Sequence, residues 1–225
     1  MVNKDISFVI QNDVSKKFIE CLSPINSYLA PDYISVFKTD TITECMRRIL
    51  YRVNSAKPDV PYDILKNLTK EEISNKWIHY IKKCKEIRHS DGKHIVTDCN
   101  FNLMGHIDCV VTMDDISYAL NVFSVDPELF DARNASRKHV VQMTLDMWLA
   151  SKNNGLILYE NKLTNEYKVY NITFYQPIIN SAVEKCKKMI EFKLKGKMCS
   201  RPYKTKDSNE CSICEFKSTC WVKGD

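Results

Sequence analysis

The C-terminal end of the chain carries three closely spaced cysteines, Cys211, Cys214 and Cys220, in the pattern C-x2-C-x5-C. Thiolates are soft ligands, and four of them suit a structural zinc ion or an iron–sulfur cluster. Because three cysteines complete neither kind of site, a fourth ligand has to come from a distant part of the chain. Cys45, which precedes a basic and aromatic segment ending in Tyr51, is the candidate. The pattern therefore predicts a metal-held clasp between the two ends of the chain.

Composition places the chain among ordinary globular proteins. Of its 225 residues 44% are hydrophobic and 27% are charged, and the low glycine count favours long helices with a modest sheet over a loop-rich barrel. The first residues lack the features of a secretory signal, and no apolar run approaches the ~18 residues of a membrane span. We therefore expect a cytoplasmic protein without membrane contact. In that compartment cysteines stay reduced, and closely spaced ones indicate metal ligands.

The order of apolar patterns predicts an α/β fold with a mixed sheet flanked by helices. We expect a helix capped by Asp40 or Thr41, and a second helix that begins with a capping box from Thr69 to Glu72. The next predicted elements, in chain order, are three antiparallel strands at 94–101, 103–112 and 117–125, a helix at 134–151 ended by Asn153–Gly155, strands at 155–159 and 167–172, and a helix at 176–195. The predicted divisions are an N-terminal helical or irregular segment at 1–38, the α/β core at 39–198 and the cysteine-rich tail at 199–225.

Several residues in this order match one known family. Gly105 stands three residues before Asp108, Gln142 lies on the next helix, the strand ending at Lys162 begins with aromatic and apolar residues, and the cysteine tail follows. In these residues and their order, the chain resembles the PD-(D/E)XK nuclease superfamily over roughly residues 40–225. The most similar branch contains the RecB-like, CRISPR-associated and phage exonucleases that carry a four-cysteine iron–sulfur cluster.

The resemblance implies a restriction-endonuclease-like core, DNA as a partner, and a cofactor. The implied cofactor is a [4Fe–4S] cluster, with zinc as the alternative, and it would be structural. Its ligands would be Cys45, Cys211, Cys214 and Cys220, so that the tail packs on the helix after Cys45. The segment 155–174 is close to the form found in phage exonucleases, which points to a virus-encoded protein in a host cell.

The resemblance also implies a catalytic site that this sequence does not complete. Nucleases of this kind use Mg²⁺ or Mn²⁺ held by two carboxylates on neighbouring strands, with a lysine two residues beyond the second. Asp108 matches the first carboxylate, but Asn121 stands at the position of the acid and Phe123 at that of the lysine. An amide binds a divalent cation weakly, and a phenyl ring stabilises no oxyanion. The sequence therefore predicts a nuclease fold with a degenerate active site.

Two alternatives would restore catalysis. In the first, the site has migrated: Asp146, where the family commonly has tyrosine, and Lys138 lie on the helix of Gln142 and face Asp108. In the second, Glu160 and Lys162 form an E-x-K motif of their own, although they lie beyond a helix and more simply belong to a structural strand. His79 falls near an upstream histidine that adds a metal ligand in this branch. A lone histidine on a helix is otherwise a structural residue.

These observations leave three functional hypotheses. The first is a DNA-associated protein with a degenerate site, acting as a binding or accessory subunit in DNA replication, recombination or processing. The second is an active divalent-metal-dependent DNA exonuclease with a migrated site at Asp108, Asp146 and Lys138. The third is a zinc-stapled adaptor between proteins. The first hypothesis is supported by a net charge of +5 and by a basic segment near the C-terminus. This segment is either a phosphate-binding surface or a solvated helix face. Its basic residues are Lys185, Lys187, Lys188, Lys193, Lys195, Lys197, Arg201 and Lys204.

Overall fold

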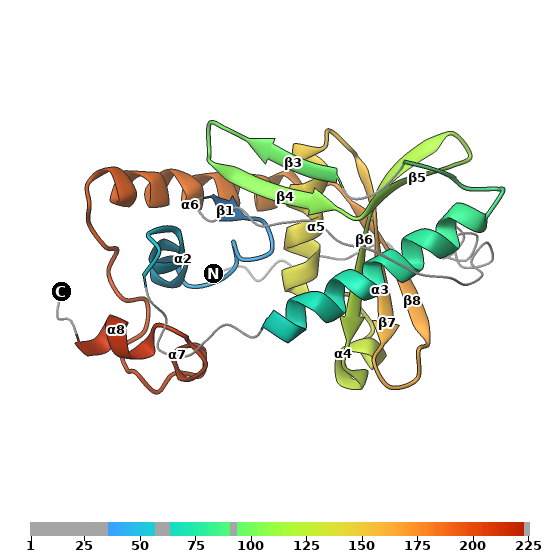
Figure 1. Cartoon of the computed structure of the whole chain (residues 1–225). Coiled ribbons are helices and arrows are strands. Elements are labelled where there is room, and N and C mark those ends of the chain that lie inside the picture. Colours follow the sequence, from blue (N-terminus) through green and yellow to red (C-terminus); the bar gives the residue numbers. More distant parts are fainter. Residues whose placement is uncertain (1–35, 57–63, 91–93, 223–225) are drawn as a thin grey trace.

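The structure is a computed structural model that describes residues 36–56, 64–90 and 94–222, with side chains described from residue 72 onward in the second range (Figure 1). The predicted N-terminal segment at 1–38 therefore lies almost entirely outside the described residues. The strands are β1 (Phe37–Lys38), β2 (Arg88–His89), β3 (His94–Asp98), β4 (Leu103–Ile107), β5 (Cys109–Met113), β6 (Ile116–Val125), β7 (Asn154–Asn161) and β8 (Tyr167–Thr173). The helices are α2 (Met46–Val53), α3 (Ile64–Lys83), α4 (Pro127–Asp131), α5 (Arg137–Leu149), α6 (Gln176–Leu194), α7 (Asn209–Ser212) and α8 (Lys217–Val222).

The central sheet has five strands in the order β2-β5-β6-β7-β8. Strands β6 and β7 are parallel and the other neighbours are antiparallel, so the prediction of a mixed sheet is confirmed. The predicted strand at 103–112 is broken at Asp108, and its first half, β4, belongs to a second sheet with the order β1-β4-β3. Asp108 thus lies where the chain passes from one sheet to the other.

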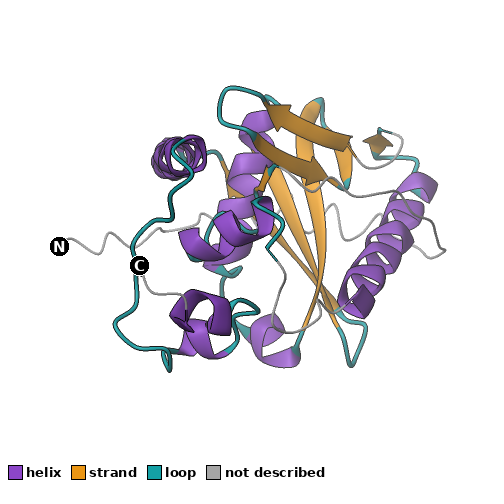
Figure 2. Ribbon diagram, turned by 60° about the vertical axis from the view of Figure 1, so that its left-hand side comes forward, coloured by secondary structure: helices purple, strands orange, loops and turns teal. Residues whose placement is uncertain are grey.

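Helices cover both faces of the central sheet, as Figure 2 shows. The side chains of β6 alternate between these faces because successive residues of a strand point in opposite directions. Leu120 and Val122 pack in the same cluster as the buried face of α3, which includes Trp77. Ala119 and Phe123 pack with α5 on the other face. Asn121 lies two residues from both Ala119 and Phe123 along the strand, so its side chain points to the same face and faces α5.

A further layer covers the outer side of α5. Leu145 of α5 packs in one cluster with Leu50 of α2 and with Ile179 and Met189 of α6. The C-terminal tail lies beside α2 at the outer edge of this layer (Figure 1). The molecule is therefore stacked in the order α3, central sheet, α5, and then α2 with α6.

Two predicted helix starts are wrong. Residues 39–44 form turns after β1, in which the Thr39 N–H bonds the carbonyl of Met104, and the helix begins only at Met46 with Cys45 as its N-cap. Helix α3 begins at Ile64, which places the predicted capping box inside the helix, and it ends at Lys83. The glutamates of a capping box are also good helix formers, so they occur inside helices as well.

The predicted end of the helix at 134–151 is also shifted. The C-cap of α5 is Ala150, followed by Ser151 with a φ of 53°, whereas Gly155 lies inside β7. Gly155 is needed there for close packing, because a Cβ atom would lie 2.5 Å from Sδ of Met147 on α5. Among the described residues, none of the helices is long and apolar enough to cross a membrane.

Candidate active site and cysteine site

Asp108, the predicted metal ligand, is buried and bonded to the backbone of β6. The whole residue is only 1% exposed to solvent. Its backbone N–H donates to the carbonyl of Leu120 at 3.0 Å and to Oδ1 of Asn121 at 3.2 Å. Its carboxylate Oδ2 accepts a hydrogen bond from the N–H of Val122 at 2.8 Å. The aspartate is thus held at the sheet junction by main-chain contacts of the neighbouring strand.

Asn121, at the position of the missing acid, links Asp108 to Asp146. Its Oδ1 accepts from the Asp108 N–H, and its Nδ2 donates to Oδ2 of Asp146 at 2.8 Å. The other carboxylate oxygen of Asp146 accepts from the hydroxyl of Thr39 at 2.7 Å. Asn121 and Asp146 are 1% and 0% exposed, so the hydrogen bonds replace water that neither group can reach. We call Thr39, Asp108, Asn121 and Asp146 the polar node.

Gly105, the glycine that precedes Asp108 in the motif, makes room for this node. A Cβ atom at position 105 would overlap Oδ1 of Asp146 and would lie 2.9 Å from the side chain of Thr39. Contacts this close do not occur between real side chains. The glycine therefore allows the carboxylate of α5 to lie directly against the backbone of β4.

Phe123, at the position of the missing lysine, belongs to an aromatic cluster. Its ring stacks on that of His139, with ring centroids 4.0 Å apart and an interplanar angle of 10°. Nδ1 of His139 lies 2.6 Å from the hydroxyl of Tyr159, which also accepts a hydrogen bond from the N–H of Ser136 at 3.0 Å. Burial raises the pKa of Tyr159. The place of the lysine ammonium is therefore filled by stacked rings.

Of the other predicted catalytic residues, one lies next to the polar node and two lie away from it. Gln142 is 1% exposed and lies one turn before Asp146 on α5, and its Nε2 has no hydrogen-bond partner among the described residues. Lys138 is exposed in the first turn of α5, and the eight-residue separation places it about 12 Å along the helix from Asp146. His79 lies on α3, which covers the sheet face opposite α5.

The second E-x-K motif is divided between different partners. The carboxylate of Glu160 accepts hydrogen bonds from Nζ of Lys76 at 2.7 Å and from Nε1 of Trp77 at 2.5 Å, both on α3. Lys162 forms an exposed pair with Asp126 at 3.0 Å. Glu160 therefore fastens α3 to β7 on the face away from Asp146, as expected for a structural strand.

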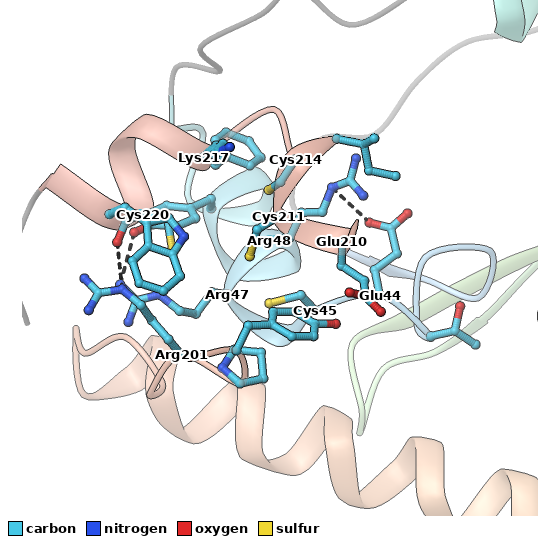
Figure 3. Close-up of a pocket in the computed structure, with 17 residues that line it drawn as sticks. Glu44, Cys45, Arg47, Arg48, Arg201, Glu210, Cys211, Cys214, Lys217 and Cys220 are labelled. Atoms are coloured by element: carbon cyan, nitrogen blue, oxygen red, sulfur yellow. Dashed lines mark hydrogen bonds and ion pairs between the residues drawn. The ribbon is translucent and has the colours of Figure 1, made fainter. Parts of the chain in front are cut away.

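The four predicted cluster ligands line one cavity of about 220 Å³ (Figure 3). Cys45 caps α2, Cys211 lies in α7, Cys214 follows α7, and Cys220 lies in α8. The thiols surround the cavity as free cysteines, and burial raises the pKa of Cys214. Among the residues that the structure describes, no three His, Cys, Asp or Glu side chains are grouped closely enough to hold a metal ion as they stand. The donor set, four soft thiols around one cavity, fits the chemistry of the predicted cofactor.

Basic residues hold the backbone around this cavity. Arg47, although 4% exposed, donates to the carbonyl of Cys199 at 2.7 Å, and Nε of Arg201 donates to that of Cys220 at 2.9 Å. Nζ of Lys185 donates to the carbonyls of Ile42, at 2.5 Å, and Glu44. Burial lowers the pKa of Lys185. The prediction that Lys185 belongs to an exposed basic surface is therefore wrong, because this side chain supports the segment that carries Cys45.

Sequence reasoning missed several residues of the two sites. Thr39 contacts Asp146 across 107 positions, and no motif marks it. His139 and Tyr159 lie within the matched segments, but only the stacking on Phe123 reveals their role. Glu215, next to Cys214, is bound by two arginines of α2. Its position next to Cys214 is the sequence feature that could have marked it.

Structural comparison finds the same kind of fold in solved proteins. The chain is similar to the crystal structure of SSO0001, with a TM-score of 0.55 and 16% identity over 93% of this chain and 94% of that one. It is also similar to LHK-Exo, an alkaline exonuclease from Laribacter hongkongensis, with a TM-score of 0.53 and 8% identity over 72% of this chain and 89% of the exonuclease. No family model matches the sequence, and no curated protein matches it at a significant level. At these identities the similarity concerns the fold, and the expected nuclease-like α/β fold is confirmed to that extent.

Proposed function

We propose that this protein binds DNA through a nuclease-like fold whose own catalytic site is degenerate. In this proposal it acts as a binding or accessory subunit in DNA replication, recombination or processing. Its relatives in fold include an exonuclease, an enzyme class that acts on nucleic acid ends. The partner class is therefore DNA, and a protein of a DNA-processing complex is the second expected partner.

The observation that carries the proposal is the double hydrogen bond of Asn121. A divalent cation in a nuclease needs carboxylate oxygens with lone pairs directed at it. In the polar node one oxygen of Asp108 and both oxygens of Asp146 accept hydrogen bonds from protein groups. Asn121 contributes an amide whose oxygen is already engaged by the Asp108 N–H. Together with the aromatic cluster at Phe123, these contacts support a packed polar core in place of a catalytic centre.

The cysteine site would serve stability in this proposal. Cys45, Cys211, Cys214 and Cys220 would hold a [4Fe–4S] cluster, with zinc as the alternative. When bound, the group would cross-link the C-terminal tail to α2 and supply no chemistry to the polar node. The four thiols line one cavity of about 220 Å³, which supports one shared group at this place.

Exposed lysines near the end of α6 are the strongest candidates for phosphate contacts. Lys187 and Lys195 form pairs with glutamates of the same helix. Lys188, Lys193 and Lys197 are exposed and face solvent. Phosphate contacts release counterions from DNA, so binding through this surface should weaken steeply with salt.

Binding of labelled single-stranded and duplex DNA, measured at several salt concentrations, tests the proposal. The triple variant Lys188→Gln, Lys193→Gln, Lys197→Gln should bind more weakly and reduce the slope of log K against log salt by up to about 2–3 units. The matched control changes Lys82, Lys83 and Lys85, three exposed lysines at the end of α3, to glutamine. If the two triple variants changed the DNA affinity and the salt slope equally, this would contradict a specific DNA-binding surface at the end of α6. No salt-dependent binding at all would favour the adaptor between proteins.

The migrated active site is the second candidate, and one contact favours it. Asn121 brings Asp146 of α5 into the same node as Asp108, as that hypothesis requires of the two carboxylates. In this alternative Mg²⁺ or Mn²⁺ would displace hydrogen bonds of the node. Metal-dependent cleavage of DNA that is lost in both Asp108→Ala and Asp146→Asn would establish it.

A further inference from the structure

We propose that Glu215 is a latch residue that docks the C-terminal cysteine segment on α2 without any metal. With Arg48 and Arg52 it would keep the cysteine site assembled in the metal-free protein, ready to be loaded. The inference rests on the cysteine site proposed above. It does not depend on DNA binding or on the state of the catalytic site.

The carboxylate of Glu215 is held by both arginines at once. Its Oε2 lies 2.5 Å from both Nε and Nη2 of Arg48. Its Oε1 lies 2.6 Å from Nε and 2.5 Å from Nη2 of Arg52. The side chain of Glu215 is only 11% exposed, and those of the arginines are 22% and 24% exposed. Each arginine thus directs two nitrogens at one carboxylate oxygen, and charge-assisted hydrogen bonds of this kind are stronger than neutral ones.

A second glutamate closes the network on the other side. Oε2 of Glu44 accepts a hydrogen bond from Nη1 of Arg52 at 2.7 Å and lies 3.5 Å from Nε of Arg48. Two cations and two anions therefore alternate in one cluster, so that no charge is left without a partner. Glu44 immediately precedes Cys45 and Glu215 immediately follows Cys214. The network thus ties together the neighbours of two candidate ligands that are far apart in sequence.

An apolar contact reinforces the latch. Phe216, the next residue of the tail, is 2% exposed and stacks on Tyr51 of α2, with ring centroids 5.3 Å apart. Burial of this aromatic ring favours docking of the tail on α2 whether or not a metal is bound. The hydrogen bonds and the ring contact of the latch join carboxylate, guanidinium and aromatic groups. The tail can therefore be positioned before the cysteines bind anything.

Hydrogen–deuterium exchange of the metal-free protein tests this inference. Metal is removed with a chelator under reducing, anaerobic conditions, and exchange is followed in the amides of Cys214, Lys217 and Cys220, which donate to backbone carbonyls within the tail. We expect these amides to be protected in the metal-free wild type. In Glu215→Gln they should exchange about tenfold faster, since a charge-assisted fork becomes a neutral contact. Amides of the central strand β6 should not change, which separates a local docking role from a general loss of stability.

Glu191→Gln is the matched control. Glu191 forms an ion pair with Lys195 whose side chains are 61% and 58% exposed, and the substitution removes the same charge outside the tail. It should leave exchange in the tail unchanged. If Glu215→Gln also disturbs β6, Arg52→Lys keeps the charge but removes the fork and should give a smaller, local effect. The inference would be overturned if the tail amides exchanged equally fast in the metal-free wild type, in Glu215→Gln and in Arg52→Lys.

Discussion

Asn121 makes two hydrogen bonds that a carboxylate at the same position could not make together. An aspartate could accept from the Asp108 N–H, but it could not donate to the carboxylate of Asp146, which lies 2.8 Å from the amide nitrogen. Two buried carboxylates at that distance repel each other in a medium of low polarity. The amide therefore fits a site in which the second carboxylate comes from helix α5 and not from strand β6.

Asn121→Asp should accordingly destabilise the protein. We expect a loss of about 2–4 kcal/mol in the free energy of unfolding, because the change replaces a buried hydrogen bond by a like-charge contact. Chemical denaturation monitored by circular dichroism measures it.

The double variant Asn121→Asp, Asp146→Asn is the matched control for this change. It exchanges the amide and the carboxylate and should recover more than half of the lost stability. A single variant as stable as the wild type would contradict the hydrogen-bond assignment.

Gly105→Ala tests the packing of the same node. The new methyl group would overlap Oδ1 of Asp146, so Asp146 must move out of its bond to Thr39. We expect a loss of about 1–3 kcal/mol in the free energy of unfolding. In an Asp146→Ala background the overlap with Oδ1 is removed and only the close contact with Thr39 is left, so the cost of the added methyl should shrink. An unchanged cost in that background would show that the strain lies elsewhere.

At the scale of elements, most strands and the helix at 176–195 were predictable, whereas two helix starts and the break of the strand at Asp108 were not. Alternating β-branched and aromatic residues marked the strands from 94 to 125, and all of these strands were found with antiparallel partners along the chain. The start of α3 was missed because Glu72 suits a helix interior as well as a cap. The Asp108 region was predictable from Gly105, but the role of Thr39 required the parallel pairing of β1 with β4, which no local pattern contains.

Cys214→Ser tests the clasp between the tail and α2. If the thiols hold a [4Fe–4S] cluster, the variant should lose the broad visible absorbance of protein purified without oxygen and should unfold at a lower temperature. Cys99→Ser, which changes an exposed cysteine outside the cavity, should alter neither property. A colourless wild-type protein that contains one zinc ion per chain would replace the cluster assignment by zinc.

In the whole molecule, the polar node and the cysteine site lie in different layers. The node lies between the sheet strands and the inner side of α5, whereas the cysteines lie beyond α2 at the outer edge. A substitution at the cysteines should therefore leave the packing of the node intact.

The claim that catalysis is lost is tested most directly by nuclease activity. Labelled single-stranded and duplex DNA should remain intact with Mg²⁺ or Mn²⁺ at enzyme excess, and any trace of cleavage should be the same in the wild type and in Asp108→Ala. Robust, metal-dependent degradation that Asp108→Ala abolishes would contradict the degenerate site and would identify the polar node as a working active centre.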